Sequence, residues 1–210
     1  MVWVVLLAAA QAGDVACSDG QNVGTSNVVG QSETHVLLRD EISYPDKMGI
    51  GLRLWSHANA CEKRWHITDD ANDTTTRTAN WAAAEKDLKG LGVELFAKSA
   101  LLEPTAAPEL EMCVLHKATW TVGEHRLCLS TELQDPGDNA RWVTSLASCP
   151  EGGQPTPIAE VASHSKWSNA NATACVQGIW QSPVDDHRLW VVSGFIGSVH
   201  NRVVTVDLPR

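Results

Sequence analysis

Residues 38–67, LRDEISYPDKMGIGLRLWSHANACEKRWHI, decide the fold class of this chain. A short strand leads into a turn at residues 43–47, where Ser, Pro and Asp favour chain reversal. Residues 50–55 then alternate with a period of two, and a further strand ends at residues 65–67. The stretch therefore predicts an antiparallel arrangement of consecutive strands.

The rest of the chain continues this pattern of short strands broken by Pro, Gly and Asp, which predicts a single all-β domain over residues 35–210. One helix is expected at residues 80–89, where Ala, Glu, Lys and Leu favour helix and Gly90 can stop it. Residues 18–34 are rich in Gly, Ser and Asn, and they are expected to form a loose N-terminal arm. Residues 68–78 are expected to form a surface loop.

Composition limits the classes of partner. The 210 residues carry a net charge of -9, from 25 acidic and 16 basic residues, and no basic run. Such a chain is not expected to bind nucleic acid or an anionic membrane surface. Nine Trp stand against two Phe and one Tyr, and Trp combines an apolar body with a polar edge that suits half-buried or ligand-facing places.

Several features favour the secretory route. Residues 1–12 resemble a signal peptide, because an apolar run is followed by Ala-Gln-Ala, which fits a cleavage site. The six Cys lack Cys-x-x-Cys spacing, so disulfides are expected rather than a metal site. Asn72 and Asn171 begin N-glycosylation sequons in polar stretches. The chain is therefore expected to be a secreted, disulfide-stabilised glycoprotein, and no transmembrane anchor is visible in the sequence.

Three short strands carry a Trp two residues before a branched aliphatic residue, at Trp65, Trp120 and Trp190. With this loose threefold layout the chain resembles the ricin-type β-trefoil lectins and, more distantly, the MIR domains. The resemblance implies a β-trefoil-like barrel in which the three Trp rings meet in the core. The Gln of the family's Gln-x-Trp signature is replaced by Lys63, Ala118 and Arg188 in the three places.

The same resemblance implies a carbohydrate site in the first repeat. Asp40 and Trp55 fall where the family places a carboxylate that accepts hydrogen bonds from sugar hydroxyls and an aromatic ring that stacks on the pyranose. Glu62 and Lys63 stand where the family completes the site with Asn or Gln. The expected partner is therefore a carbohydrate or glycoprotein, bound by Asp40, Trp55, Glu62 and Lys63 without a cofactor.

The resemblance further implies a disulfide between Cys128 and Cys149, similar to the family's Cys-flanked hairpin, whereas the pairing of the other four Cys stays open. An immunoglobulin-like or other β-sandwich is the alternative fold, since Cys113, Trp120 and Cys149 follow each other in the order Cys, Trp, Cys. A sandwich would favour a protein-binding surface or virus-like ectodomain, with exposed Trp as anchors.

No catalytic constellation stands out in the sequence. The eight His include no His-x-x-x-His pair, and no Ser stands in a Gly-x-Ser-x-Gly context. No catalytic or metal-binding residue is therefore assigned. An extracellular hydrolase is the third hypothesis, and it would require a cleft with converging carboxylates or a His.

Overall fold

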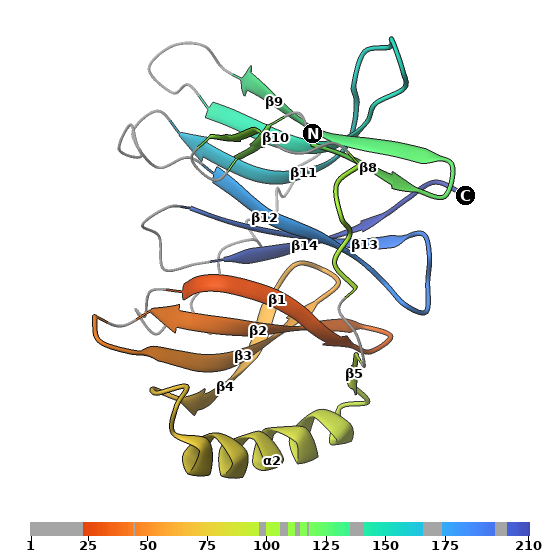
Figure 1. Ribbon diagram of the computed structural model, residues 1–210. Coiled ribbons are helices and arrows are strands. Elements are labelled where there is room, and N and C mark those ends of the chain that lie inside the picture. Colours follow the sequence, from red (N-terminus) through yellow and green to blue (C-terminus); the bar gives the residue numbers. More distant parts are fainter. Residues whose placement is uncertain are drawn as a thin grey trace, which may run out of the picture.

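The computed structural model describes residues 23–43, 45–96, 100–105, 109–111, 114–116, 118–134, 141–165, 174–195 and 201–210. Antiparallel strands dominate these residues, with one long helix, so the expected all-β class is confirmed (Figure 1). The expected leader at residues 1–12 and the sequon at Asn171 lie outside the described residues.

The first structural unit is a five-stranded sheet with the order β4-β3-β2-β1-β5. Its strands are β1 (Val23–Gln31), β2 (His35–Ser43), β3 (Met48–Ser56), β4 (Cys61–Thr68) and β5 (Glu94–Leu95). Strands β2, β3 and β4 pair in sequence order, with Asp40 opposite Gly51 and Leu52 opposite Trp65. The antiparallel arrangement expected for residues 38–67 is therefore confirmed.

Strand β1 corrects the expectation of a loose arm at residues 18–34. It pairs with β2 on one side and with β5 on the other, so it lies inside the sheet. Val28 is buried in the core, and the side chain of Ser26 is buried among polar partners. These tertiary contacts outweigh the turn preference of Gly, Ser and Asn in this segment.

Two further sheets follow in the chain. The four-stranded sheet has the order β11-β10-β9-β8, and the three-stranded sheet has the order β12-β13-β14. Strands β6 (Glu109–Glu111) and β7 (Val114–His116) form a separate two-stranded antiparallel sheet. The remaining bounds are β8 (Thr119–Val122), β9 (His125–Gln134), β10 (Arg141–Ser148), β11 (Thr156–Ser165), β12 (Ala174–Gln181), β13 (Arg188–Phe195) and β14 (Arg202–Asp207).

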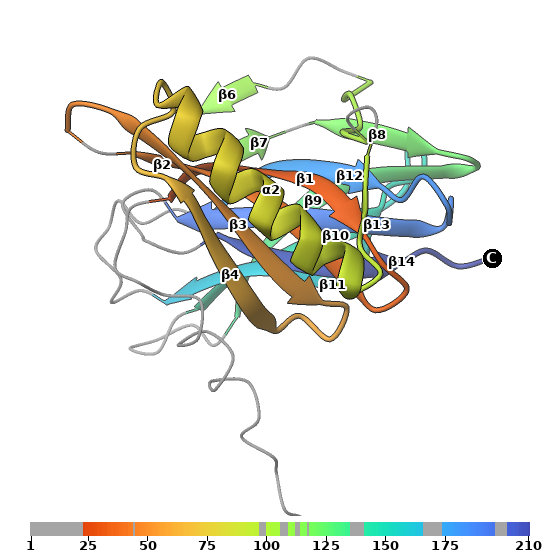
Figure 2. The same ribbon diagram turned by 90° about the horizontal axis from the view of Figure 1, so that it is seen from below.

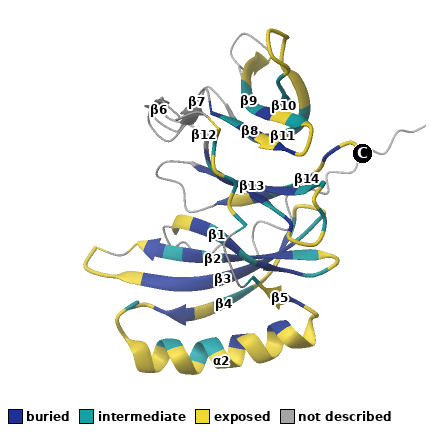
Figure 3. Cartoon of the chain, turned by 45° about the vertical axis from the view of Figure 1, so that its right-hand side comes forward, coloured by how far each residue is buried: buried dark blue, intermediate teal, exposed yellow. Residues whose placement is uncertain are grey.

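The elements stack in layers, in the order helix α2, five-stranded sheet, three-stranded sheet and four-stranded sheet (Figure 1). Three clusters of buried side chains fill the spaces between successive layers. The three-stranded sheet is consequently covered on both faces. Trp190 and Val192 of β13 face the five-stranded sheet, while Leu189 and Val191 face the four-stranded one, and all four are fully buried (Figure 3).

Helix α2 (Thr74–Gly90) is longer than the expected helix at residues 80–89. It begins in the segment expected to be a loop, because the side chain of Asp73 accepts a hydrogen bond from the backbone N–H of Thr76 and caps the first turn. The helix lies across the five-stranded sheet (Figure 2), and Ala84 and Leu88, four residues apart, are its buried residues.

The threefold arrangement of a β-trefoil is not found among the described residues. Trp65 lies on β4, Trp120 on β8 and Trp190 on β13, so the three rings belong to three different sheets and pack in three different clusters. Sheets that stack face to face are closer to the alternative, a β-sandwich, with a third sheet and a helix added.

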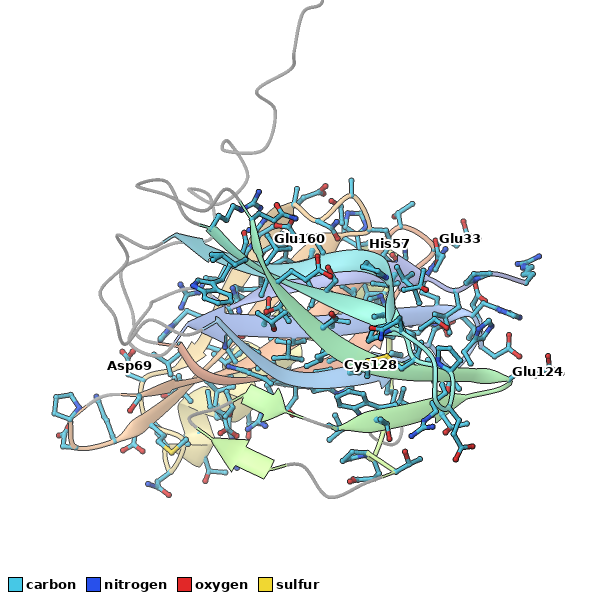
Figure 4. All side chains as sticks on the ribbon, turned by 90° about the horizontal axis from the view of Figure 1, so that it is seen from above. Glu33, His57, Asp69, Glu124, Cys128 and Glu160 are labelled. Carbon is cyan, nitrogen blue, oxygen red and sulfur yellow. A yellow bond between two sulfur atoms is a disulfide. The ribbon has the colours of Figure 1, made fainter. Side chains whose placement is uncertain are left out.

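The disulfide between Cys128 and Cys149 is present, with a Cα–Cα distance of 5.9 Å (Figure 4). Cys128 lies on β9 and Cys149 directly follows β10, the adjacent strand in the same sheet. The bond therefore does not join two sheets as in an immunoglobulin domain. Cys61 is also disulfide-bonded.

Replacing Cys128 and Cys149 together by Ser should lower the free energy of unfolding by about 3 kcal/mol, because the bond closes a loop in the unfolded chain. Urea unfolding followed by Trp fluorescence measures the change. Thr121→Ser, at an exposed position on the neighbouring strand β8, is the control. An unchanged midpoint for the double variant would show that the loop is already restricted in the unfolded chain.

Candidate functional site

Two of the four residues expected to form the sugar site, Asp40 and Trp55, are inaccessible. Asp40 is 0% exposed and Trp55 is 2% exposed. Both side chains lie on the face of the five-stranded sheet that is covered by the three-stranded sheet. A sugar cannot reach either of them without separating the two layers, so the expected site at Asp40 and Trp55 is wrong.

Asp40 instead belongs to a buried polar network. Arg53 lies on β3, two residues beyond Gly51, the register partner of Asp40, and it donates from Nε to Asp40 Oδ2 at 2.5 Å and from Nη2 to Oδ1 at 2.9 Å. Ser26 donates its hydroxyl to Asp40 Oδ1 at 2.6 Å. Almost every polar atom of this bidentate ion pair has a hydrogen-bond partner. A buried ion pair is tolerated under that condition.

The network joins two layers. Arg53 Nη1 donates to the backbone carbonyl of Asn201, and Asn201 Nδ2 donates to Ser26 Oγ. The side chain of Gln177 accepts from the backbone N–H of Ser26 and donates to the carbonyl of Gly24. These contacts connect the five-stranded sheet to the three-stranded sheet, so the role of Asp40 is to hold the layers in register.

Glu62 and Lys63, the other expected site residues, lie on β4 and point in opposite directions. The Glu62 carboxylate oxygen Oε2 lies 2.9 Å from Nε2 of the His35 ring, within hydrogen-bond distance. Lys63 pairs with Asp87 of helix α2 at 3.1 Å and lies over the ring of Trp65. Trp65 also donates its indole N–H to Asp87, and these two hydrogen bonds lower the pKa of the Asp87 carboxyl. The structure therefore does not bring the four expected residues together.

A hollow of about 420 Å³ lies elsewhere, between helix α2 and the uncovered part of the five-stranded sheet. Its aromatic wall is Trp81, which is half-buried. The complete lining is Arg39, Ile50, Ile67, Arg77, Thr78, Trp81, Ala82 and Glu85.

The lining of this hollow follows from two regular periods. On the helix, residues 77, 78, 81, 82 and 85 recur at intervals of three and four, so they share one flank. On the sheet, Arg39 has the same orientation as Leu37, which packs toward the helix. Sequence reasoning missed the hollow because the contact between α2 and β4 depends on tertiary packing. The available signal in the sequence was the spacing of Trp81 and Glu85, which are four residues apart and therefore lie on the same flank of the helix.

The chemistry of the hollow combines one ring with charges of both signs. Arg77 is held in place because its Nη1 donates to the carbonyl of Ala71 at 2.8 Å. A guanidinium has five N–H donors, so this hydrogen bond does not use all of them. Arg39 lies 3.6 Å from Glu41, a long ion pair between side chains about one-third exposed. Glu85 is exposed and supplies acceptors. The hollow can therefore offer an apolar plate, hydrogen-bond donors and an acceptor to one ligand.

A second concave region lies at the other end of the sheet, beside β5. It consists of two adjoining hollows of about 600 and 670 Å³ that share Gln31, Glu94 and Val184. Gln31 accepts a hydrogen bond from Ser182 at its buried floor. We call this region the β5 groove.

His57 lies near the same end of the molecule as Glu33 (Figure 4), where its backbone N–H donates to the carbonyl of Thr34. Burial and the neighbouring guanidinium of Arg188 lower the pKa of His57. Its Nδ1 atom lies 3.4 Å from Nη1 of Arg188, and its Nε2 atom is buried without a hydrogen-bond partner. The neutral imidazole is therefore the form that the folded chain favours.

Among the described residues, no group of three or more His, Cys, Asp and Glu side chains is placed to hold a metal ion. In the same part of the chain, no helix has the length and apolar character that crossing a membrane requires.

Arg53→Met should lower the free energy of unfolding by about 3–5 kcal/mol, because it leaves the Asp40 carboxylate buried without its cation. The double variant Asp40→Leu, Arg53→Met should cost less than this single variant, since no unpaired charge remains. Arg39→Met is the matched control, with an expected change of about 0–1 kcal/mol, because its ion pair with Glu41 is about one-third exposed. Urea unfolding measures all three, and a double variant less stable than Arg53→Met would contradict the assignment.

The stability of the protein should fall as the pH decreases below about 6.5, the ordinary pKa of His. In this range the unfolded chain takes up a proton at His57 that the folded chain resists, because the folded pKa is lowered. His57→Asn should reduce the loss of stability between pH 7 and pH 5, measured by thermal unfolding. Thr121→Ser, at an exposed position and without change of an ionisable group, is the control and should leave the loss unchanged. Equal pH dependence in both variants would exclude His57 as the source.

The chain has no match among the protein-family models, the curated proteins or the solved structures. The chemistry of the hollow at Trp81 and of the β5 groove therefore carries the proposals below.

Proposed function

We propose that the protein is a secreted carbohydrate-binding module whose sugar binds in the hollow beside Trp81. The observation that carries this proposal is the half-buried Trp81 ring with Arg39, Arg77 and Glu85 around it in one hollow of about 420 Å³. An aromatic plate bordered by charged hydrogen-bonding groups is a common way to bind a neutral or acidic polyol.

The arrangement supports a division of roles among the lining residues. The Trp81 ring would stack on the apolar face of a pyranose. The two guanidinium groups would donate hydrogen bonds to ring hydroxyls or to a sugar carboxylate, and Glu85 would accept from a hydroxyl. The hollow has a volume that suits one or two sugar units, and its apolar base of Ile50 and Ile67 is already packed.

The position of the first sequon agrees with a secreted glycoprotein. Asn72 has an exposed side chain directly before the cap of helix α2, where a glycan could extend into water. The disulfide at Cys128 is of the kind that persists in oxidising compartments. Secretion and glycosylation thus form part of the same proposal.

Trp81→Ala should weaken retention on an array of neutral and acidic glycans by about tenfold or more, because the stacking surface is lost. Glu85→Ala should also weaken retention without changing the melting temperature, since Glu85 is exposed. Trp81→Phe should keep part of the binding because a ring remains.

Trp142→Ala, at a Trp on the four-stranded sheet that is 40% exposed, is the control for a general effect of losing an indole. Retention that is equal for the wild type and Trp81→Ala would overturn the proposal. Absence of retention on every glycan by a folded wild-type protein would do the same.

A further inference from the structure

Exposed apolar side chains gather in the β5 groove. Seven large apolar residues are exposed among the described residues, and four of them line this region. Their exposed fractions are 76% for Val184, 47% for Leu91, 40% for Leu101 and 36% for Leu95. Single exposed apolar residues are ordinary on a protein surface, whereas a group of them along one groove indicates an interaction site.

Three segments distant in sequence build this surface. Leu91 and Leu95 lie in the chain that leaves helix α2 and enters β5. The backbone N–H of Phe96 donates to Val29 of the five-stranded sheet, and that of Leu102 donates to Ile179 of the three-stranded sheet. The groove therefore lies where these two layers meet, and both of its walls are fixed by backbone hydrogen bonds.

The rim of the groove is acidic. Glu33 and Glu94 are exposed, and Asp185 is partly exposed. The one cation in the lining, Arg188, donates to Asp207 at 2.8 Å, so its charge is already compensated. A second copy of this chain would bring the same carboxylates to the contact, and like charges across an interface are unfavourable. The complementary occupant is instead apolar and basic.

We propose that the β5 groove binds a segment of a partner protein in which apolar side chains alternate with Lys or Arg. The apolar side chains cover Val184, Leu91, Leu95 and Leu101, and the basic side chains face Glu33, Glu94 and Asp185. Strand β5 is the last strand of its sheet in the described structure, so an extended segment can lie alongside it. This surface is separate from the hollow at Trp81, and it does not depend on sugar binding.

The test uses a fluorescein-labelled heptapeptide of alternating Lys and Val, with binding to the full chain measured by fluorescence anisotropy in 150 mM salt. Glu94→Lys and Val184→Ser should each weaken its binding by about tenfold, because one reverses a rim charge and the other removes apolar cover. Both positions are exposed, so neither variant should unfold the chain.

Matched controls separate this site from general attraction to an acidic protein. Glu151→Lys changes the net charge by the same amount at an exposed position outside the groove, and Met48→Ser removes an apolar side chain that is 49% exposed at the start of β3. Both should stay within about twofold of the wild type. A heptapeptide of alternating Lys and Ser should bind weakly.

Three results would overturn the proposal. The first is no binding of the Lys and Val peptide, and the second is an equal loss in Glu94→Lys and Glu151→Lys, which would indicate charge attraction without a site. The third is a dimer in sedimentation analysis that Val184→Ser dissociates, because it would assign the groove to a second copy of the chain.

Discussion

The buried ion pair between Asp40 and Arg53 is the interaction on which the layered structure depends. A charge pair can remain between two apolar layers only if its remaining hydrogen-bonding atoms find partners there. Those partners, Ser26 and Asn201, come from β1 and from the residue before β14. Gly194 of β13 lies so close to Asn201 that a Cβ atom would collide with its side-chain oxygen. The two sheets can therefore close in one relative position, in which all of these groups fit.

The strands of residues 38–67 could be predicted because their signals are local: turn residues between two alternating runs. The burial of Arg53 could not, since its partner carbonyl at Asn201 is 148 positions away. The alternation of apolar and polar residues in β3 predicts that one face of the strand is exposed to solvent. In the structure α2 covers one face of β3 and the three-stranded sheet covers the other. Asp40 and Trp55 stand at the spacing of the sugar-binding residues in the lectin family. They are core residues here, because the three-stranded sheet covers the face on which they lie.

The hollow at Trp81 and the β5 groove both arise from incomplete cover of the same sheet. Helix α2 has only two buried residues, and a narrow contact of this kind leaves the flank around Arg39 and Trp81 open. At β5 the sheet ends in a strand of two residues, and the chain departs toward the three-stranded sheet. Neither surface is encoded by one sequence motif, because each combines side chains from elements that meet only after the layers have packed.

The double burial of the three-stranded sheet has a consequence for biosynthesis. Its strands β12, β13 and β14 come from residues 174–207, after both of the sheets that it separates. During translation the inner faces of those two sheets stay uncovered until the three-stranded sheet has been synthesised. Apolar side chains such as Val36, Leu38 and Leu127 are then in contact with water or with a chaperone. The strands of this sheet pair with their sequence neighbours, but its packing against the two earlier sheets depends on contacts between distant parts of the chain, which form slowly. Emergence of residues 174–207 from the ribosome is thus the step after which the nascent chain can complete this core.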